Sequence, residues 1–356
     1  MKVATVVGAR PQFIKAAPVS CALRKHHHEV LIHTGQHYDV NMSDIFFNEL
    51  DIPHPDYQLG IGSGLHGAQT GAILSKIEEV LLIEKPDTVL VYGDTNSTLA
   101  GALAAAKLHI PVLHIEAGLR SFNRRMPEEI NRVLTDHLAT MLFCPTNTAI
   151  KNLESEGITN GVYQIGDVML DAFKYNKKLA EQRSQINERL GLVPGQYVLC
   201  TIHRAENTDN VERLSNILQA VSKVSSTIVL PLHPRTRKII QTEGFETLIG
   251  PRVKIIDPVG YLDMIALEVN ATKILTDSGG VQKEAYFAGV PCITMRDETE
   301  WSETVEVGWN QLTGASTEKI IKAVENGFPP AERPDIFGQG DSAQRFTRIL
   351  EESLKR

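Results

Sequence analysis

The feature that most constrains the fold of this chain is a repeated alternation along its 356 residues. Short apolar runs rich in β-branched residues are separated by longer amphipathic segments. Parallel strands covered on both faces have this near-continuous apolar pattern, and crossovers between them need a helix, so the alternation predicts parallel βαβ units and an α/β fold class. The expected strands are Val3–Val7, Val30–Thr34, Thr88–Tyr92, Val112–Ile115, Leu142–Pro145, Val162–Ile165, Tyr197–Ile202, Ser226–Pro231, Val253–Ile256, Lys273–Thr276 and Cys292–Met295. The expected helices are Thr95–Lys107, Pro127–Leu138, Val211–Val224, Tyr261–Val269 and Val281–Ala288.

The strands form two series, and the length exceeds what one hydrophobic core usually organises, so we expect two Rossmann-like, doubly wound domains. We place the first at residues 1–170 and the second at 171–340. The charged stretch Lys174–Arg189 is expected to be a helix near the crossover. A closing helix at 341–356 joins the second domain or packs back on the first. Since ligands bind at the carboxyl ends of such strands, we expect the two domains to face each other across a ligand-binding cleft.

Composition excludes several classes of function. A net charge of −7 gives no general basic surface for nucleic acid, so a phosphate ligand needs locally placed cations. The apolar run before Gly8 is too short for a signal peptide, and no run approaches the roughly 18 apolar residues of a membrane span, so we expect a cytoplasmic protein without membrane contact. The four cysteines form no CxxC pair, which favours buried free thiols. His26–His28 is expected to be a solvated loop rather than a metal site.

The segment Leu275–Ala285 joins an apolar run to a helix through the small residues Ser278, Gly279 and Gly280. The first amides of a helix lack intrahelical partners, and the macrodipole adds positive charge there, so this turn is a candidate phosphate site. Glu284, about a turn and a half into the helix, is placed to accept hydrogen bonds from ribose hydroxyls. An ordinary strand-to-helix turn with an Asp or Ser cap is the structural alternative.

The turn after the first strand places two cations, Arg10 and Lys15, at a helix start, which suits a phosphate or a sugar carbonyl. The structural alternative is surface charge on a helix with Pro11 at its first position. This turn lacks the GxGxxG spacing of a dinucleotide fingerprint, so NAD is disfavoured.

Further polar residues follow other expected strands. Asp94 is a candidate functional carboxylate or a helix cap. Glu116 ends a buried strand, where a charge is costly without a task or a partner. Glu128 and Glu129 open a helix, where acidic residues are often only complements to the dipole. His203 and His233 each follow a strand of the second series.

This inventory contains a phosphate cradle, cations, carboxylates and histidine, with neither metal-ligand spacing nor a Ser/His/Asp arrangement. It suits acid–base chemistry on a nucleotide-activated small molecule. Six motifs, in this order, resemble the non-hydrolysing UDP-N-acetylglucosamine 2-epimerase family. They are Gly8-x-Arg-Pro with Lys15, Gly93-Asp-Thr, His114-x-Glu-Ala-Gly-Leu-Arg, Pro127-Glu-Glu-x-Asn-Arg, His203-Arg and Thr276-Asp-Ser-Gly-Gly-x-Gln-x-Glu-Ala.

The resemblance implies a glycosyltransferase-B-like pair of domains, a homodimer, no cofactor and no metal. It implies inversion at C2 of a UDP-N-acetylhexosamine, UDP-GlcNAc to UDP-ManNAc, by elimination and re-addition of UDP through a glycal, in the synthesis of cell-surface polysaccharide precursors. The candidates that it implies for acid–base work or for positioning the intermediate are Asp94, Glu116, Glu128 and His203. The residues that it implies for substrate binding are Arg10, Lys15, Arg132, His233, Ser278, Gly279, Gly280 and Glu284.

Departures from the family pattern concern the substrate. Four segments resemble those of the branch that acts on UDP-2,3-diacetamido-2,3-dideoxy-glucuronate: Gly35–Asp39, Ser121–Met126, His203–Asn207 and Thr299–Glu303. Arg124 or Arg125 is a candidate partner for the carboxylate of such a substrate, with exposed loop arginines as the alternative. A GT-B glycosyltransferase, a hydrolysing epimerase and a non-catalytic nucleotide-sugar binding protein remain alternative functions.

Overall fold

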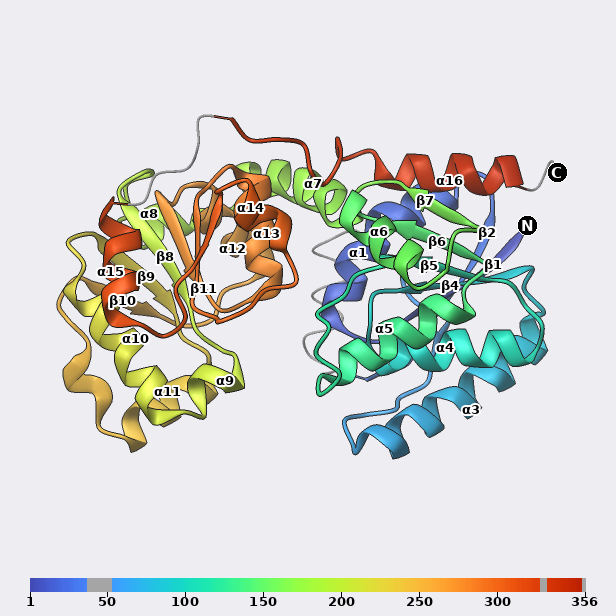
Figure 1. The fold of residues 1–356 in the computed structure, drawn as a ribbon, viewed down its shortest axis with the longest axis horizontal. Coiled ribbons are helices and arrows are strands. Elements are labelled where there is room, and N and C mark those ends of the chain that lie inside the picture. The colour runs from blue at the N-terminus through green and yellow to red at the C-terminus, as the bar shows by residue number, and fades with distance from the viewer. Residues whose placement is uncertain (37–52, 327–331, 354–356) are drawn as a thin grey trace. The chain divides into compact units, whose positions relative to one another are not determined.

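The computed structural model describes residues 1–36, 53–326 and 332–353, without the side chain of Arg10. The chain divides into two compact units (Figure 1). Unit 1 comprises Met1–Ala172 and Asp335–Arg356, and unit 2 comprises Phe173–Pro334. The long helix α7, Val168–Arg183, carries the chain from unit 1 into unit 2.

Unit 1 contains a parallel sheet in the order β3-β2-β1-β4-β5-β6-β7. Its strands are β1 Lys2–Val7, β2 His28–His33, β3 Tyr57–Gln58, β4 Thr88–Tyr92, β5 Val112–Ile115, β6 Met141–Cys144 and β7 Val162–Gln164. The central strands are mainly apolar and almost entirely buried, so each contributes side chains to a core on both faces. Val6, Val91 and Ile73, for example, are fully buried in one shared cluster.

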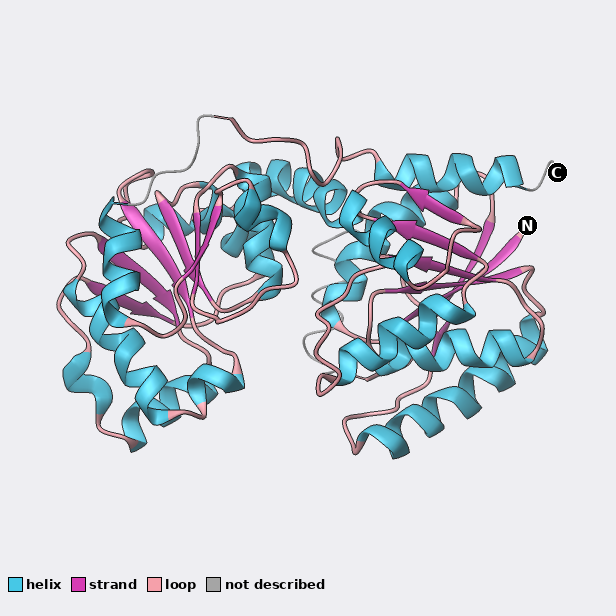
Figure 2. Ribbon diagram, in the orientation of Figure 1, coloured by secondary structure: helices cyan, strands magenta, loops and turns pink. Residues whose placement is uncertain are grey.

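Helices cover both faces of this sheet (Figure 2). They are α1 Arg10–Leu23, α3 His66–Glu84, α4 Asn96–Lys107, α5 Pro127–Leu138, α6 Asn147–Ser155 and α16 Ser342–Ser353. The closing helix α16 packs against α1 and places Phe346 edge-on to Phe143 of β6, with ring centroids 4.8 Å apart. The last helix of the chain therefore shares the core of the first unit.

Unit 2 contains a six-stranded parallel sheet in the order β10-β9-β8-β11-β12-β13. Its strands are β8 Tyr197–Thr201, β9 Thr227–Pro231, β10 Val253–Ile256, β11 Lys273–Thr276, β12 Cys292–Thr294 and β13 Asn310–Leu312. Its helices are α8 Ile186–Arg189, α9 Ala205–Thr208, α10 Val211–Lys223, α11 Pro234–Thr242, α12 Tyr261–Val269, α13 Gly279–Ala288, α14 Ser302–Glu306 and α15 Thr317–Asn326, with a 3₁₀ turn at Phe245–Leu248.

The predicted α/β class with two doubly wound sheets is confirmed, and each expected strand is present within two residues at either end. One helix prediction was wrong. The stretch 174–189 is not one helix, because α7 begins earlier, at Val168, ends at Arg183 and is followed by the separate turn α8. Cys144, Cys200 and Cys292 are buried free thiols as predicted, whereas Cys21 is exposed on α1.

Candidate functional site

Each sheet reverses its strand order at one point. In unit 1 the chain moves outward from β1 to β2 and β3 and then returns to β4 on the other side of β1. In unit 2 the same reversal lies between β8 and β11. Loops diverge outside the carboxyl ends of the strands at such a switch point, which is where doubly wound proteins bind ligands. Most of the predicted site residues follow strands at these switch points, and they form two groups that belong to different units.

The turn after β5 holds Glu116 in an uncommon backbone conformation, with φ at +71°. Its carboxylate forms an ion pair with Lys15 of α1, and both side chains are largely buried. Gly93, after the neighbouring strand β4, has φ at +62°, and a Cβ there would lie 3.1 Å from Oε2 of Glu116. The absence of a side chain at Gly93 therefore lets the Glu116 carboxylate lie over the end of β4.

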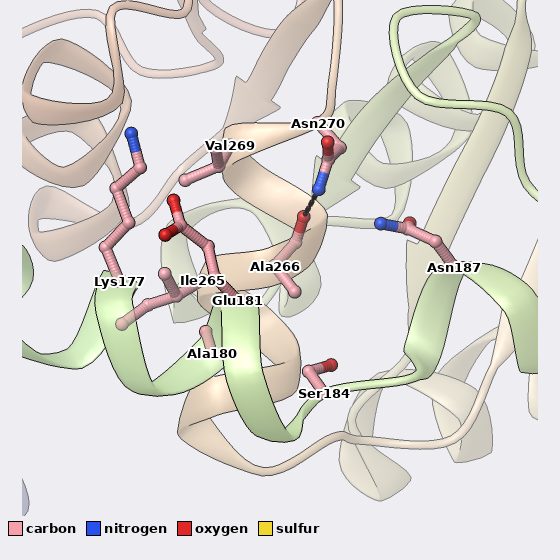
Figure 3. Close-up of a pocket in the computed structure, with 9 residues that line it drawn as sticks. All are labelled: Lys177, Ala180, Glu181, Ser184, Asn187, Ile265, Ala266, Val269 and Asn270. Atoms are coloured by element: carbon pink, nitrogen blue, oxygen red, sulfur yellow. Dashed lines mark hydrogen bonds between the residues drawn. The ribbon is translucent and has the colours of Figure 1, made fainter.

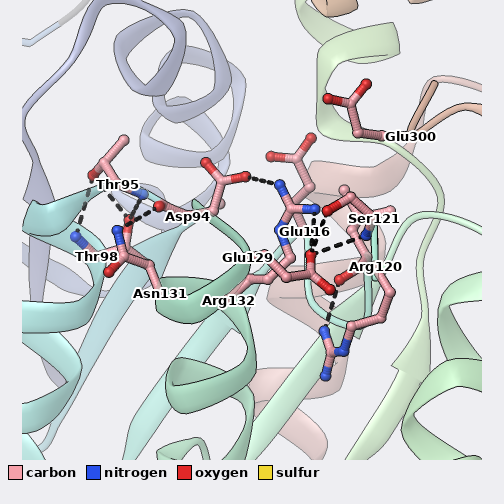
Figure 4. Close-up of polar contacts among 12 residues, drawn as sticks. Asp94, Thr95, Thr98, Glu116, Arg120, Ser121, Glu129, Asn131, Arg132 and Glu300 are labelled. Atoms are coloured by element: carbon pink, nitrogen blue, oxygen red, sulfur yellow. Dashed lines mark hydrogen bonds and ion pairs between the residues drawn. The ribbon is translucent and has the colours of Figure 1, made fainter. Parts of the chain in front are cut away.

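Asp94, the next residue after Gly93, pairs with Arg132 of α5 (Figure 4). Burial raises the pKa of the Asp94 carboxyl, and the nearby Glu116 adds to this rise, while Arg132 and Lys15 oppose it. The backbone carbonyl of Asp94 accepts a hydrogen bond from Nδ2 of Asn131 at 2.9 Å. Two carboxylates and two cations thus meet at the switch point of unit 1.

The two glutamates at the start of α5 have different surroundings. Glu129 is buried, and its carboxylate accepts hydrogen bonds from the backbone amides of Ser121 and Phe122, both at 2.9 Å, and from Arg132 at 3.1 Å. Sequence reasoning missed Glu129 as an organiser of this loop. Glu128 is exposed, and among the described residues its side chain makes no hydrogen bond or ion pair.

In unit 2, the turn after β11 is fixed to the turn after β8 by Asp277. This buried carboxylate accepts hydrogen bonds from the backbone amides of His203 at 3.0 Å and Arg204 at 3.1 Å, and from Nδ2 of Asn207 at 3.1 Å. Asp277 therefore holds the 203–207 segment beside the start of α13. Ser278 caps that helix through its hydroxyl, which accepts a hydrogen bond from the amide of Val281.

The first residue of α13, Gly279, is surrounded by three groups that a phosphate would meet. A Cβ there would lie 3.7 Å from each of Nη2 of Arg204, Oε2 of Glu300 and Nε1 of Trp301. At Gly280 a Cβ would have no contact closer than 3.9 Å. The first amides of α13 thus lie beside a guanidinium and an indole N–H, which are donors suited to an anion. The third neighbour, the carboxylate of Glu300, is paired with Arg296 at 2.9 Å. Arg204 and Trp301 were not among the predicted site residues.

Glu284, farther along α13, is buried, and its Oε1 accepts a hydrogen bond from the hydroxyl of Tyr261 at 2.8 Å. Glu268 of α12 is fully buried beside it. Burial raises the pKa of Glu268 well above its usual range, and the proximity of Glu284 raises it further. Two carboxyl groups therefore share this buried region, although the sequence suggested only one of them.

The two candidate histidines lie on exposed turns of unit 2. His203 follows β8, with Nδ1 3.8 Å from Oδ1 of Asp277. Partial burial lowers the pKa of His203, the nearby Arg204 and His233 lower it further, and Asp277 opposes the change. His233 caps α11, and its Nδ1 accepts a hydrogen bond from the amide of Arg235 at 3.3 Å.

A pocket of about 250 Å³ lies elsewhere in unit 2, between α7, α8 and α12 (Figure 3). The nine residues that line it, among them Lys177, Ser184 and Asn270, include no predicted site residue. Within the described residues, no cluster of His, Cys, Asp and Glu is arranged to hold a metal ion. No helix in the same part of the chain is long and apolar enough to cross a membrane. Arg10 begins α1, but its side chain lies outside the described part of the structure.

Comparison with known proteins gives matches over nearly the whole chain. The family model described as UDP-N-acetylglucosamine 2-epimerase matches residues 21–351. A UDP-N-acetylglucosamine 2-epimerase homolog from Methanococcus maripaludis is 56% identical over 98% of this chain and 99% of its own. The UDP-2,3-diacetamido-2,3-dideoxy-D-glucuronate 2-epimerase of Pseudomonas aeruginosa is 50% identical over the same shares. The crystal structure of the Methanocaldococcus jannaschii UDP-GlcNAc 2-epimerase with UDP-GlcNAc and UDP covers 99% of this chain and 100% of its own, with 50% identity and a TM-score of 0.90.

Fold and site together define a doubly wound, two-sheet α/β protein whose polar residues gather at the switch point of each sheet. The matches extend over both units and include the segments that carry these residues. The chain belongs to the UDP-N-acetylglucosamine 2-epimerase family.

Proposed function

We propose that this protein inverts C2 of a UDP-N-acetylhexosamine, converting UDP-GlcNAc to UDP-ManNAc. The observation that carries the proposal is the end-to-end match with relatives of this name at 50% and 46% identity. The site supports it independently, since unit 1 gathers carboxylates and cations at its switch point and unit 2 opens a helix N-terminus at its own.

The reaction requires two acid–base groups, because the proton leaves one face of C2 and returns to the other. A base takes the C2 proton while the C1–O bond breaks, and UDP departs with the electron pair of that bond, which leaves a glycal. An acid then protonates C2 from the opposite face, and a UDP oxygen re-forms the bond to C1. Glu116 and Asp94 are our first candidates, because one is held by Lys15 and the other has a pKa raised by burial. Glu128 and His203 remain candidates for the same work.

The diphosphate must leave and return within one turnover, so it needs firm contacts outside the reacting sugar. We assign these contacts to Ser278, the amides of Gly279 and Gly280, and the guanidinium of Arg204. His233 and Arg10 are further candidates, and Glu284 is the candidate partner of the ribose hydroxyls. Lys15 and Arg132 hold the carboxylates of unit 1.

A second substrate has specific support. The Pseudomonas aeruginosa relative, named for UDP-2,3-diacetamido-2,3-dideoxy-D-glucuronate, matches this chain at 50% identity. A glucuronate carries a carboxylate at C6, and the exposed Arg124 and Arg125 lie in the loop before α5. These two arginines are candidate partners for that carboxylate.

Incubation in D₂O with each UDP-sugar separately, followed by NMR at C2, tests the proposal. Deuterium entry at C2 together with formation of the epimer supports epimerisation, and the faster substrate identifies the branch. Tight UDP binding with no exchange for either substrate contradicts catalysis and leaves a nucleotide-sugar binding protein. Transfer of the sugar to an added acceptor instead indicates a glycosyltransferase.

The resemblance also leads us to propose a homodimer located in the cytoplasm. Light scattering of the purified protein gives its mass in solution, and a mass equal to one chain of 39.3 kDa contradicts the dimer. Fractionation of the native cell tests the location separately.

A further inference from the structure

His114 lies at the centre of a buried polar network in unit 1, and the proposed mechanism does not use it. Its side chain is fully buried on β5, two residues before Glu116. Nδ1 lies 2.7 Å from Oδ1 of Asp136 on α5, and Nε2 lies 2.8 Å from the carbonyl oxygen of Gly93. Both ring nitrogens therefore face oxygen atoms.

These contacts constrain where protons are. A carbonyl oxygen only accepts hydrogen bonds, so Nε2 must carry a proton and donate it to Gly93. The proton between Nδ1 and Asp136 then belongs either to the ring or to the carboxyl. If it belongs to the ring, His114 is an imidazolium ion with two N–H donors.

The surroundings of Asp136 favour its ionised form. Oδ2 accepts hydrogen bonds from Nη1 of Arg120 at 2.7 Å and from the amide of Gly118 at 3.1 Å. Burial alone raises the pKa of Asp136, but the contacts with His114 and Arg120 outweigh it, and the pKa is lowered. Arg120 is itself neutralised by Glu156 at 2.7 Å, and the buried thiol of Cys144 also lies close to Asp136. Donors on Oδ2, one of them charged, favour a carboxylate, so we place the shared proton on His114.

This ion pair is connected to both turns that carry the candidate catalytic carboxylates. The carbonyl that His114 binds belongs to Gly93, and Asp94 is the next residue along the chain. Glu116 is two residues after His114, in a turn with positive φ. A charged donor forms a stronger hydrogen bond than a neutral one, so an imidazolium restrains Gly93 more tightly than an imidazole.

We propose that His114 is a positioning residue: paired with Asp136, it donates to the carbonyl of Gly93 and so fixes the Gly93–Asp94 turn relative to Glu116. The role in positioning rests on the proposed epimerase function, whereas the protonation state does not.

NMR of ¹⁵N-histidine-labelled protein tests the protonation state. Because both ring nitrogens face oxygen acceptors, both nitrogens of His114 should carry a proton in the folded protein. In Asp136→Asn the amide can donate to Nδ1, so the ring should carry one proton, on Nε2, and still bind Gly93. A single protonated ring nitrogen in the wild-type protein overturns the proposal. This measurement is made on the wild-type protein, so it does not depend on whether a variant folds.

Kinetics test the positioning. His114→Phe keeps a ring but loses both donors, so we expect kcat to fall at least about tenfold, while Kd for UDP stays within about twofold, because misplacement of reacting groups lowers the rate of chemistry. Asp136→Asn should give a kcat between those of the wild type and His114→Phe. Glu154→Gln, which changes an exposed glutamate of α6 outside the network, is the matched control and should leave kcat within about twofold.

The results separate two kinds of failure. Wild-type kcat in folded His114→Phe overturns the positioning role even if NMR shows an imidazolium. An inactive wild-type protein instead refutes the proposed epimerase function. The NMR result then tests only whether His114 and Asp136 form an ion pair.

Discussion

Glu268 gives a prediction about stability whose sign follows from the structure. This glutamate is fully buried on α12, close to the Glu284 carboxylate that accepts a hydrogen bond from Tyr261. Burial, and then the charge of Glu284, raise the pKa of Glu268 well above its usual range. The folded protein therefore keeps a proton on Glu268 at pH values where the unfolded chain has released it.

This difference makes the free energy of unfolding depend on pH. The pKa of Glu268 is higher in the folded state than in the unfolded state. Its contribution to the free energy of unfolding is therefore fully present below the unfolded pKa of about 4.3, and it is lost as the pH rises toward the raised pKa of the folded state. One extra proton in the folded state changes the stability by up to about 1.4 kcal/mol per pH unit within that window. Gln has nearly the same shape and cannot ionise. Glu268→Gln should therefore remove this slope and be more stable than the wild type at neutral pH.

Urea unfolding at a series of pH values measures the slope. Both tryptophans, Trp301 and Trp309, lie in unit 2 together with Glu268, so their fluorescence reports the unfolding of that unit. Glu246→Gln changes an exposed glutamate of the same unit and should keep the wild-type slope. Identical pH dependence of the wild type and Glu268→Gln would refute the view that Glu268 is buried as the neutral acid.

Three further predictions concern the site. Glu116→Gln should lower kcat at least about 100-fold, the usual scale for an acid–base group, while calorimetry shows unchanged UDP affinity. Gly93→Ala should lower kcat and should lower the free energy of unfolding by about 1–2 kcal/mol, because φ is +62° and the new Cβ would crowd Glu116. An epimerase assay and urea unfolding measure the two effects. Arg204→Met should weaken UDP binding at least about tenfold, because hydrogen bonds to charged groups contribute about 1.5–3 kcal/mol. The control Arg237→Met changes a partly exposed arginine of the same unit and should leave the UDP affinity unchanged. Calorimetry measures both affinities.

The sequence predicted the sheets well because their strands are mainly apolar and rich in β-branched residues, as in β1 and β4. The two missed strands show the limit of that signal. β13, with the sequence Asn-Gln-Leu, has no β-branched residue, and β3 has only two residues, so propensity indicates neither. Both are edge strands that pairing with the neighbouring strand defines.

Individual site residues were harder to predict than strands, because their contacts join distant parts of the chain. The cost of burying a charge identified Glu116, but its partner Lys15 lies 101 residues away. Glu128 and Glu129 are adjacent in the first turn of α5, and the rotation of the helix decides which one is buried. The structure buries Glu129, and no local pattern distinguishes the two. Asp277 likewise reads as a cap in sequence, whereas it binds the amides of the 203–204 segment.

The backbone of Glu116 gives a final prediction that separates the strain of this turn from its charge. A residue with a side chain at φ +71° is strained, typically by about 1–2 kcal/mol, and glycine is not. Neither Glu116→Ala nor Glu116→Gly can contact Lys15, and the two differ only by a Cβ, so their difference in stability isolates the backbone. We expect Glu116→Gly to be more stable than Glu116→Ala by about 1 kcal/mol in urea unfolding, with both variants inactive. Equal stabilities would show that the turn is unstrained. A more stable glycine variant would show that Glu116 occupies a backbone position better suited to glycine. Strained backbone positions of this kind cluster at functional sites.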